Sequence, residues 1–529
     1  LINHIDHLPE ESFFLFIENL KKLKVDEIAE DTKEIIWSTL KQFIRRHRRF
    51  SDTWWSLDED KLLQLDEVVK IFLPTDPLYL YKLLFGNRDH DLYEESGDWE
   101  RQRKKLEEDR KNAIQEILKS SGLDSIVTFT QLVEDSYQVG VSLSSIEDQT
   151  IDSFILDLLK KSENKKEYLM IKAYVFNRSK SLGLSWLETI DHLSWSTELK
   201  VKFLSILPFN AETWIKVNEW MQDDSNQYWL NVDVQPYQVE ADLDVAISNL
   251  LEFGRPEVAI DCLYTQIHLR KPINVKFCTQ ALLEASRVEK LNVYHVQELI
   301  EYLQNDLSVE SDILASIEYK FLTLLDSNST VKPKFLENKI NNEARFFSEI
   351  ITKVYRSDKE ETKEVELTEN DKAQARQFER LLRNWSTIPG QDIDLNFDSE
   401  KFKSWFKEVQ SLTKESGHLN VAMRVIGRVL VNSPIDKSGL WIDKDIAQLL
   451  NEKNNLEMRS AFGSSLITSR GPYWVDQTGE ADLKLSEEFF SKADAVENEG
   501  FARLAIEVRN VAMYYKKEGE RLKHSSQEE

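Results

Sequence analysis

Glycine, proline and cysteine are all scarce in this chain of 529 residues. It holds 15 glycines and 11 prolines, about 3% and 2% of the chain, where typical proteins use about 7% and 5%. Collagen-like chains, low-complexity chains and glycine-rich barrels all need more of these residues, so the shortage excludes those classes. Long helices tolerate such a composition best, and we expect a helical protein.

Only two cysteines occur, Cys262 and Cys278, and they do not form a CxxC motif. A secreted protein built on disulfides would need more cysteines in a chain of this length. The cysteine usage therefore fits a reducing compartment, and we expect a cytoplasmic protein.

Long apolar runs and an excess of positive charge are missing as well. No run of about 18 apolar residues occurs, so we expect no membrane span. Asp and Glu number 93 against 68 Lys and Arg, which gives a net charge of −25. So acidic a chain repels phosphate backbones, which argues against nucleic acid as a partner, although a local basic patch could still bind an anion.

Common catalytic motifs are absent too. The sequence contains no GxxxxGK[ST] loop, no GxGxxG after a strand, no HExxH and no GxSxG, which removes the usual signatures of nucleotide, zinc and serine chemistry. We expect this region not to be an enzyme, and to need no cofactor and no metal.

What remains is a large, amphipathic, helical pattern. A chain of this length exceeds one compact core, and its 41% hydrophobic and 30% charged residues are typical of a globular protein. Gly254 can end one helix in a left-handed conformation, Pro256 fits the first turn of a second helix running to His268, and the small Ala259 allows close approach. The Gly-x4-Ala spacing recurs at Gly417/Ala422 and Gly500/Ala505. The sequence therefore predicts an all-α fold, an array of irregular helical hairpins like a TPR or HEAT α-solenoid.

Further helix limits can be placed along the chain. A charged helix is expected over 99–118, with helix ends near Gly122, Gly140 and Gly183. Later helices are expected at 399–413, 418–432, 442–460, 481–498 and 501–522. The segment 230–239 is the one place where a short extended piece is reasonable.

Breaks in the pattern divide the chain into three expected domains. Pro236 and Tyr237 mark a seam, and residues 356–375 hold almost no core-forming side chains, followed by a helix capped near Thr368. We expect an N-terminal helical array over 1–235, a helical-hairpin unit over 236–356 and a C-terminal helical domain over 357–529. The N-terminus lacks an initiator Met, so we expect a fragment or a processed product of a longer polypeptide.

Four arginines form a basic cluster, Arg45, Arg46, Arg48 and Arg49. One interpretation is a helix end that complements its own dipole and the nearby acids Asp52, Asp58 and Glu59. The other is a grip for an anion or an acidic partner surface.

One pair of tryptophans and one short loop are two further candidate binding sites. Trp54 and Trp55 are adjacent and cannot easily point into one core, so one of them could be exposed for a partner. The tract SRGPYW (469–474) brings Arg470, Tyr473 and Trp474 together in a loop. Such a loop can bind a partner or simply pack.

Six tracts together resemble a known kind of protein. They are DPLYLYKLLFG (76–86), DWERQRKKLEEDRKNAIQEILKSSGLDSI (98–126), LPFNAETW (207–214), LLEFGRPEVAIDCL (250–263), RLLRNWSTIPG (380–390) and SRGPYW (469–474). In this order they resemble the C-terminal helical half of large bacterial multidomain proteins associated with anti-phage defence, over about residues 30 to 520. Those proteins usually carry Asn where this chain has Thr468. The resemblance implies a missing N-terminal effector or NTPase domain, and a sensing or scaffolding role for this half.

Three functional hypotheses follow. The first is a helical scaffold or sensor that binds a protein partner, either another subunit or a phage component, and regulates or assembles a defence effector. The second is a metal-dependent nuclease or nucleotide-processing enzyme on a helical fold, with acids such as Glu107 or Asp261 holding Mg²⁺. The third is an architectural region that forms homo- or hetero-oligomers.

Overall fold

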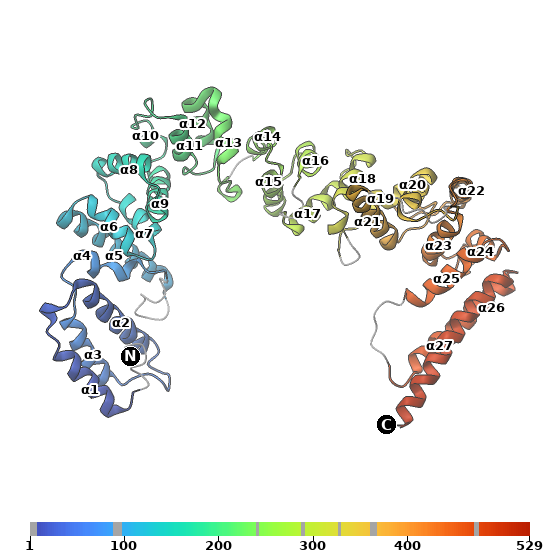
Figure 1. The fold of residues 1–529 in the computed structure, drawn as a ribbon, viewed down its shortest axis with the longest axis horizontal. Coiled ribbons are helices and arrows are strands. Elements are labelled where there is room, and N and C mark those ends of the chain that lie inside the picture. The colour runs from blue at the N-terminus through green and yellow to red at the C-terminus, as the bar shows by residue number, and fades with distance from the viewer. Residues whose placement is uncertain are drawn as a thin grey trace. The chain divides into compact units, whose positions relative to one another are not determined.

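The chain folds almost entirely into helices (Figure 1). The computed structural model describes residues 8–87, 98–239, 243–286, 291–325, 329–359, 368–469 and 476–528. Over these ranges the only β-type pairing is the isolated antiparallel bridge between Gln391 and Phe397. The predicted all-α class is therefore confirmed.

Contacts along the chain separate two compact units, Leu1–Asp242 and Leu243–Glu529. The helices of the first unit are α1 (Glu10–Lys21), α2 (Glu30–Arg49), α3 (Glu59–Ile71), α4 (Pro77–Leu80), α5 (Trp99–Ser121), α6 (Asp124–Leu132), α7 (Ser136–Ser144), α8 (Gln149–Lys161), α9 (Lys165–Leu182), α10 (Leu184–Leu187), α11 (Thr197–Leu204), α12 (Ala211–Met221) and α13 (Ser225–Asn231). Short 3₁₀ turns occur at Val25–Glu27, Lys82–Phe85, Gln222–Asp224 and Pro236–Gln238.

The expected extended piece at 230–239 does not form a strand. Helix α13 continues to Asn231, and the turn Pro236–Gln238 follows after four residues that lie outside any helix. The fixed φ of Pro236 suits the first position of such a turn.

Helices α1, α2 and α3 share one core at the start of the first unit. Phe13 and Ile17 lie one turn apart on α1, and both are buried, as are Trp37 and Leu40 on α2. Because residues three or four apart share one helix face, these side chains meet Leu65 of α3 in a single cluster.

The charged helix expected at 99–118 is α5, and its ends follow from local chemistry. The Asp98 carboxylate accepts a hydrogen bond from the Arg101 amide at 3.0 Å, which caps the first turn. Gly122 ends the helix with a φ of 76°, a conformation that glycine adopts without steric cost. Gly183 ends α9 in the same way, with a φ of 64°.

Gly140 does not end a helix as expected, because it lies inside α7. A side-chain carbon at this position would collide with the carbonyl oxygen of Met170 and with Ala173, both on α9. The glycine therefore allows α7 and α9 to touch backbone to backbone, a role that depends on the packing partner and not on the local sequence.

Five tryptophans of the segment 186–230 lie in the first unit's interior. All are buried, namely Trp186, Trp195, Trp214, Trp220 and Trp229. Phe203 stacks on Trp220, with ring centroids 5.7 Å apart, and Trp195 meets Phe203 edge to face at 5.4 Å. These side chains hold α11, α12 and α13 together, as buried aromatic pairs do.

The second unit holds fourteen described helices. They are α14 (Asp244–Glu252), α15 (Pro256–His268), α16 (Val275–Glu284), α17 (Val293–Gln304), α18 (Ser311–Lys320), α19 (Lys334–Asn342), α20 (Ala344–Val354), α21 (Glu369–Asn384), α22 (Ser399–Ser416), α23 (Leu419–Val429), α24 (Lys444–Asn451), α25 (Leu456–Thr468), α26 (Glu480–Asn498) and α27 (Ala502–Glu528), with 3₁₀ turns at Leu322–Leu324 and Leu430–Asn432.

Alternate helices pack side by side in the first part of this unit. Helix α14 contacts α16, α16 contacts α18 and α15 contacts α17, while consecutive helices also contact each other. The result is two layers, with α14, α16 and α18 in one layer and α15 and α17 in the other. A TPR- or HEAT-like solenoid along the whole chain stays a prediction.

The predicted hairpin turns are confirmed at all three glycines. Gly254 has a φ of 70° between α14 and α15, and Gly417 has a φ of 79° between α22 and α23. Gly500, with a φ of 91°, separates α26 from α27, which pack along each other. The predicted cap at Thr368 is also present, since Thr368 and Asp371 form a capping box at the start of α21.

The helix expected at 442–460 is divided into α24 and α25. Arg459 donates hydrogen bonds to the carbonyl oxygens of Leu450 at 2.9 Å and Glu452 at 3.0 Å. The Glu452 carbonyl also accepts from the Asn455 amide at 3.2 Å, so side-chain and backbone donors together satisfy carbonyl groups at the end of α24 and the break is stable inside an amphipathic pattern.

One hydrophobic cluster runs from Ala315 to Tyr515 and forms the core of the later helices. It includes Phe347 of α20, Trp385 after α21 and Trp405 of α22, and so contains residues from both sides of position 357. The indole Nε1–H of Trp385 donates to Asn341 Oδ1 at 2.9 Å, and that of Trp405 donates to the Ile340 carbonyl at 3.0 Å. Both large side chains are thus fixed by polar contacts with α19.

Two buried glutamates lie on neighbouring helices, Glu318 on α18 and Glu337 on α19. The Glu318 carboxylate accepts hydrogen bonds from the amides of Leu336 (2.7 Å) and Phe335 (3.2 Å) in the first turn of α19 and from Gln304 Nε2 at 2.7 Å. Burial nevertheless raises the pKa of Glu318 to about 7. Burial also raises the pKa of Glu337, whose carboxylate accepts hydrogen bonds from residues Ser386 and Thr387.

None of the helices in the described ranges combines the length and the apolar composition that a membrane span requires.

Candidate partner-binding site

The turn between α2 and α3 carries a surface of arginine and aromatic side chains. We call it the arginine–aromatic patch, defined by residues Arg45, Arg46, Arg49, Phe50, Trp54, Trp55 and Trp99. Trp54 is 95% exposed, and Trp99 and Phe50 are 51% and 41% exposed. Trp55 is half-buried beside them. Of the two adjacent tryptophans predicted to point differently, Trp54 is the exposed one.

Cation–π contacts order the patch. The guanidinium carbon of Arg46 lies 4.9 Å from the ring centroid of Trp55. That of Arg49 lies 5.4 Å from the rings of both Phe50 and Trp99. Each such contact is worth about 0.5–1 kcal/mol at an exposed site, so Arg46 and Arg49 are held in place before any partner binds.

A buried histidine at the end of α2 holds the turn in place through hydrogen bonds and ring packing. His47 is fully buried, and its Nδ1 accepts a hydrogen bond from the Leu57 amide at 3.1 Å. Its carbonyl oxygen accepts one from the Ser56 hydroxyl at 2.8 Å. Its ring packs edge to face against Trp55, with centroids 5.2 Å apart. The turn that presents Trp54 is therefore tied to the end of α2.

Arg48 faces acids of its own unit. Its guanidinium pairs with Glu59 at 2.7 Å and also with Asp66, both on α3. This matches the interpretation of the basic cluster as a helix end that is neutralised within the fold. A contact of Arg48 with a partner stays a prediction.

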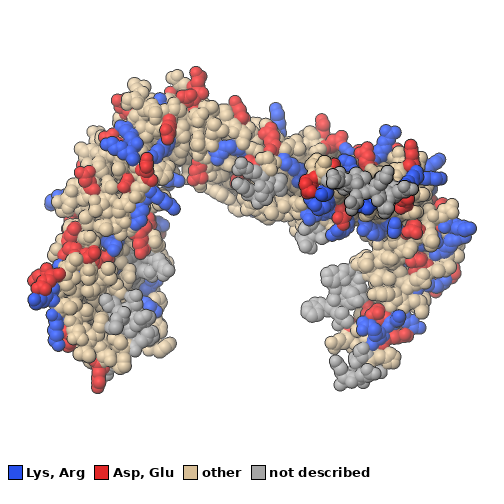
Figure 2. All heavy atoms as spheres, viewed as in Figure 1, with Lys and Arg blue, Asp and Glu red and all other residues tan. Residues whose placement is uncertain are grey.

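The patch is a local exception in an acidic chain. Over the visible face of the molecule, acidic and basic side chains are interspersed (Figure 2). Against a net charge of −25, three arginines within one turn and a half of α2 form a concentration of positive charge. Arg, Trp and Phe together are the composition of protein interface centres.

Phe50 and Trp99 were not among the predicted binding residues. The sequence contained one usable signal for Trp99, because Asp98 is a helix-capping residue and the next position lies on an exposed first turn. Trp99 contacts Arg49, which lies 50 residues earlier in the chain, and so links α5 to α2. A local sequence pattern cannot predict a contact between residues so far apart.

The second predicted site falls on a tract of which little is described. Arg470, Tyr473 and Trp474 lie outside the described residues. Ser469, the first residue of the tract, and Thr468 line a cavity of about 260 Å³ together with Arg383 and Arg428. The Thr468 hydroxyl is directed to carbonyls of its own helix, at 3.3 Å from Ser464 O.

The acids of the enzymatic hypothesis each have a neighbouring partner. Glu107 lies 3.6 Å from Arg103 on the exposed face of α5. Asp261 lies 2.8 Å from His295 Nδ1, and the His295 ring stacks on Tyr264 with centroids 3.8 Å apart. In the part of the chain that the structure describes, no three or more His, Cys, Asp or Glu side chains are grouped so that they could hold a metal ion.

No protein-family model, no curated protein and no solved structure matches this chain. The resemblance to bacterial defence proteins therefore stays a prediction that rests on the six tracts named above.

Proposed function

We propose that this chain is a non-catalytic helical scaffold that binds a protein partner through the arginine–aromatic patch. In this proposal the partner presents an acidic surface with an apolar recess for Trp54. The scaffold regulates or assembles an effector of a bacterial anti-phage system in the cytoplasm, and the effector carries any chemistry.

The observation that carries the proposal is the exposure of Trp54 next in sequence to Trp55, whose ring contacts Arg46. A tryptophan that is 95% exposed leaves a large apolar surface in water. Burying this surface at an interface would contribute favourable free energy to binding. The neighbouring arginines add bidentate donors for carboxylates. Since the arginines already rest on aromatic rings, binding would cost little side-chain entropy.

The defence role rests on the resemblance of the six tracts, and the cytoplasmic location on the cysteine usage. Cys262 and Cys278 are both free and buried, which agrees with a protein whose thiols have no structural disulfide to form.

Site-specific photo-crosslinking tests the partner-binding proposal. A photoreactive phenylalanine analogue replaces Trp54, and in a matched control it replaces Leu193, which is 84% exposed in the same unit. Crosslinked proteins from the native host are identified by mass spectrometry, and the leading one is purified. Its affinity for the whole chain is then measured by calorimetry for the unchanged protein, Trp54→Ala, Arg46→Glu and Leu193→Ala.

We expect Trp54→Ala and Arg46→Glu each to weaken binding by about 30-fold or more, the size of an interface hot spot of ~2 kcal/mol. Leu193→Ala should leave the affinity unchanged. Equal crosslinking at positions 54 and 193, or full affinity of Trp54→Ala, would contradict the proposal. A fluorescent single-stranded DNA 20-mer serves as a second probe, because binding that depends on Trp54 would identify the partner as nucleic acid instead.

A further inference from the structure

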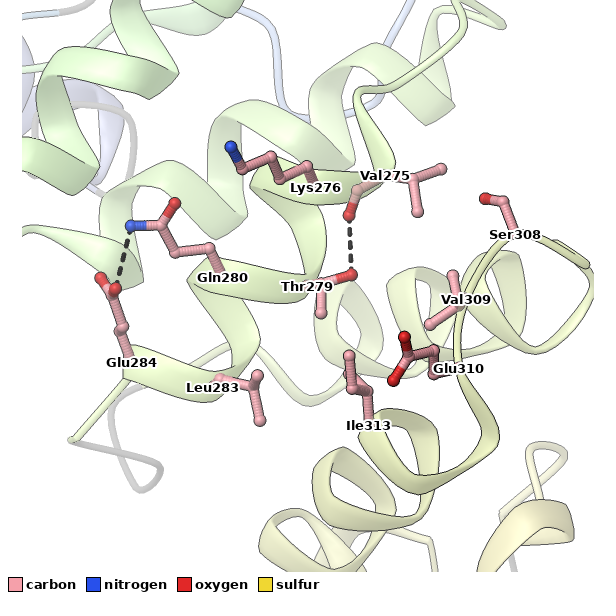
Figure 3. Close-up of a pocket in the computed structure, with 10 residues that line it drawn as sticks. All are labelled: Val275, Lys276, Thr279, Gln280, Leu283, Glu284, Ser308, Val309, Glu310 and Ile313. Atoms are coloured by element: carbon pink, nitrogen blue, oxygen red, sulfur yellow. Dashed lines mark hydrogen bonds between the residues drawn. The ribbon is translucent and has the colours of Figure 1, made fainter.

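The second unit carries an apolar groove far along the chain from the arginine–aromatic patch (Figure 3). It lies between α16 and the start of α18, in the layer formed by α14, α16 and α18, and its volume is about 570 Å³. This volume falls within the range of about 300–1,000 Å³ that is usual for binding pockets.

Apolar side chains line both walls of the groove. On α16, Val275, Thr279 and Leu283 are spaced by four residues and so lie along one face, spanning about 12 Å. The Thr279 hydroxyl donates to the Val275 carbonyl at 2.7 Å, so it needs no further partner (Figure 3). Val309 and Ile313 form the opposite wall. Leu283 is 41% exposed, which leaves its side chain open to a ligand.

A fully exposed leucine lies next in sequence to the groove lining. Leu307, in the connection from α17 to α18, is as exposed as in an extended chain, and it directly precedes the lining residues Ser308 and Val309.

Charged side chains at the edge favour a basic ligand. Glu284 and Glu310 lie at the groove, against the single cation Lys276 among its lining residues (Figure 3). Glu284 accepts a hydrogen bond from Gln280 Nε2 at 2.9 Å. Together with the net charge of −25, these carboxylates would attract a cationic segment and repel an acidic one.

The walls also select the ligand's backbone conformation. The wall on α16 is a helix, whose backbone groups are hydrogen-bonded within the helix except at the ends, while the opposite wall is the segment 308–310 and the first turn of α18. An extended peptide lying along α16 would therefore lose water from its N–H and C=O groups without gaining partners on that wall. A helical ligand satisfies its own backbone and offers apolar side chains at positions i, i+3, i+4 and i+7.

We infer that this groove binds an amphipathic helix of a partner protein, with apolar residues on one face and Lys or Arg beside them. The site is separate from the arginine–aromatic patch, and it gives the scaffold a second docking surface with the opposite charge preference.

Peptide selection tests the inference with a defined probe. A displayed library of random 16-residue peptides is selected on the whole chain, with the Leu283→Glu variant used for counter-selection. Enriched peptides are synthesised, and their affinity is measured by fluorescence anisotropy on the unchanged chain, Leu283→Glu, Leu283→Met and the charge variants Glu284→Lys and Glu310→Lys. Leu269→Glu is the matched control, because Leu269 is 43% exposed and lies outside the groove.

We expect enriched peptides with apolar residues at helical spacing and more Lys and Arg than Asp and Glu. Leu283→Glu and the two charge variants should weaken their binding at least tenfold, while Leu283→Met and Leu269→Glu should change it less than threefold. Circular dichroism of each peptide on binding should show helix formation.

Three outcomes would overturn the inference. Selection could yield no peptide that distinguishes the unchanged chain from Leu283→Glu, or the enriched peptides could be acidic or bind without helical structure. Self-association of the unchanged chain that Leu283→Glu abolishes, measured by mass photometry, would assign the groove to a second copy.

Melting curves of Leu283→Glu and Leu283→Ala show whether lost binding comes from lost folding. A folded Leu283→Ala variant with full peptide affinity would also contradict the inference.

Discussion

The backbone of Gly140 in α7 lies directly against the carbonyl group of Met170 in α9. The second unit repeats this relationship, because a side-chain carbon on Gly427 of α23 would collide with the carbonyl oxygen of Met458 on α25. In each unit two helices separated by one intervening helix thus meet through a glycine. Neither contact leaves room for a methyl group, and a backbone carbonyl cannot move aside as a side chain would.

Gly140→Ala should therefore destabilise the first unit by about 1–3 kcal/mol, the usual cost of overpacking. Melting of the chain followed by circular dichroism should show the transition of that unit at lower temperature. Gly86→Ala is the control, because a side-chain carbon there would meet its nearest neighbour, Leu83 O, at an ordinary 3.6 Å. Equal stability of Gly140→Ala and the unchanged chain would show that α7 and α9 are not in backbone contact.

Arg46 and Arg48 should separate binding from stability, although only one residue lies between them. Arg48→Glu places a third negative charge beside Glu59 and Asp66, and we expect it to cost about 1 kcal/mol of folding free energy. Arg46→Glu should cost less, about 0.5 kcal/mol, because Arg46 is exposed and loses only its cation–π contact with Trp55. Urea denaturation of both variants measures this, and the reverse order of stability would refute the assignment of Arg48 to the fold.

The buried Glu318 should make stability depend on pH. Its pKa rises from 4.5 to about 7 in the folded chain, so the folded protein holds a proton that the unfolded chain releases at lower pH. This contribution to stability is fully present below pH 4.5 and is lost as the pH rises through 7, by roughly 3 kcal/mol at about 1.4 kcal/mol per pKa unit.

Glu318→Gln removes this titration, because the amide stays neutral. The difference in unfolding free energy between the variant and the unchanged chain, measured in urea at several pH values, should shift in favour of Gln between pH 5 and 7. The amide group of the variant faces backbone N–H donors, and the cost of that contact does not vary with pH. A difference that is constant across this range would show that Glu318 does not titrate there.

Both cysteines should be inert in the folded chain. Cys262 and Cys278 are fully buried, and burial raises the pKa of both thiols. For Cys262 the pKa rises to about 12. The thiolate is the reactive form, so a disulfide reagent at pH 8 should label neither residue in the native protein and both in urea. Ser316→Cys adds an exposed thiol as a positive control. Labelling of either native cysteine at the rate of this control would contradict their burial.

Helix limits could be predicted largely because they depend on neighbouring residues. Gly254 and Pro256 specify the turn between α14 and α15 through their own backbone preferences, and α15 runs from Pro256 to His268 as predicted. Thr368 caps α21 through a contact only three residues away. The prediction of helix limits failed where distant groups determine them. Gly140 lies inside α7, where it packs against Met170 of α9. Helix α24 ends where Arg459 of α25 donates a hydrogen bond to the Leu450 carbonyl.

The candidate site divides in the same way. The sequence alone determined that the chain is helical, acidic and poor in cysteine, and that arginines and tryptophans gather near the end of α2, because composition and local spacing carry that information. Only the tertiary structure decided that Trp54 faces solvent, that Arg48 is paired with Glu59 and Asp66, and that Trp99 joins the patch. Exposure and charge pairing depend on which helices pack together, and those contacts join residues that are far apart in the chain.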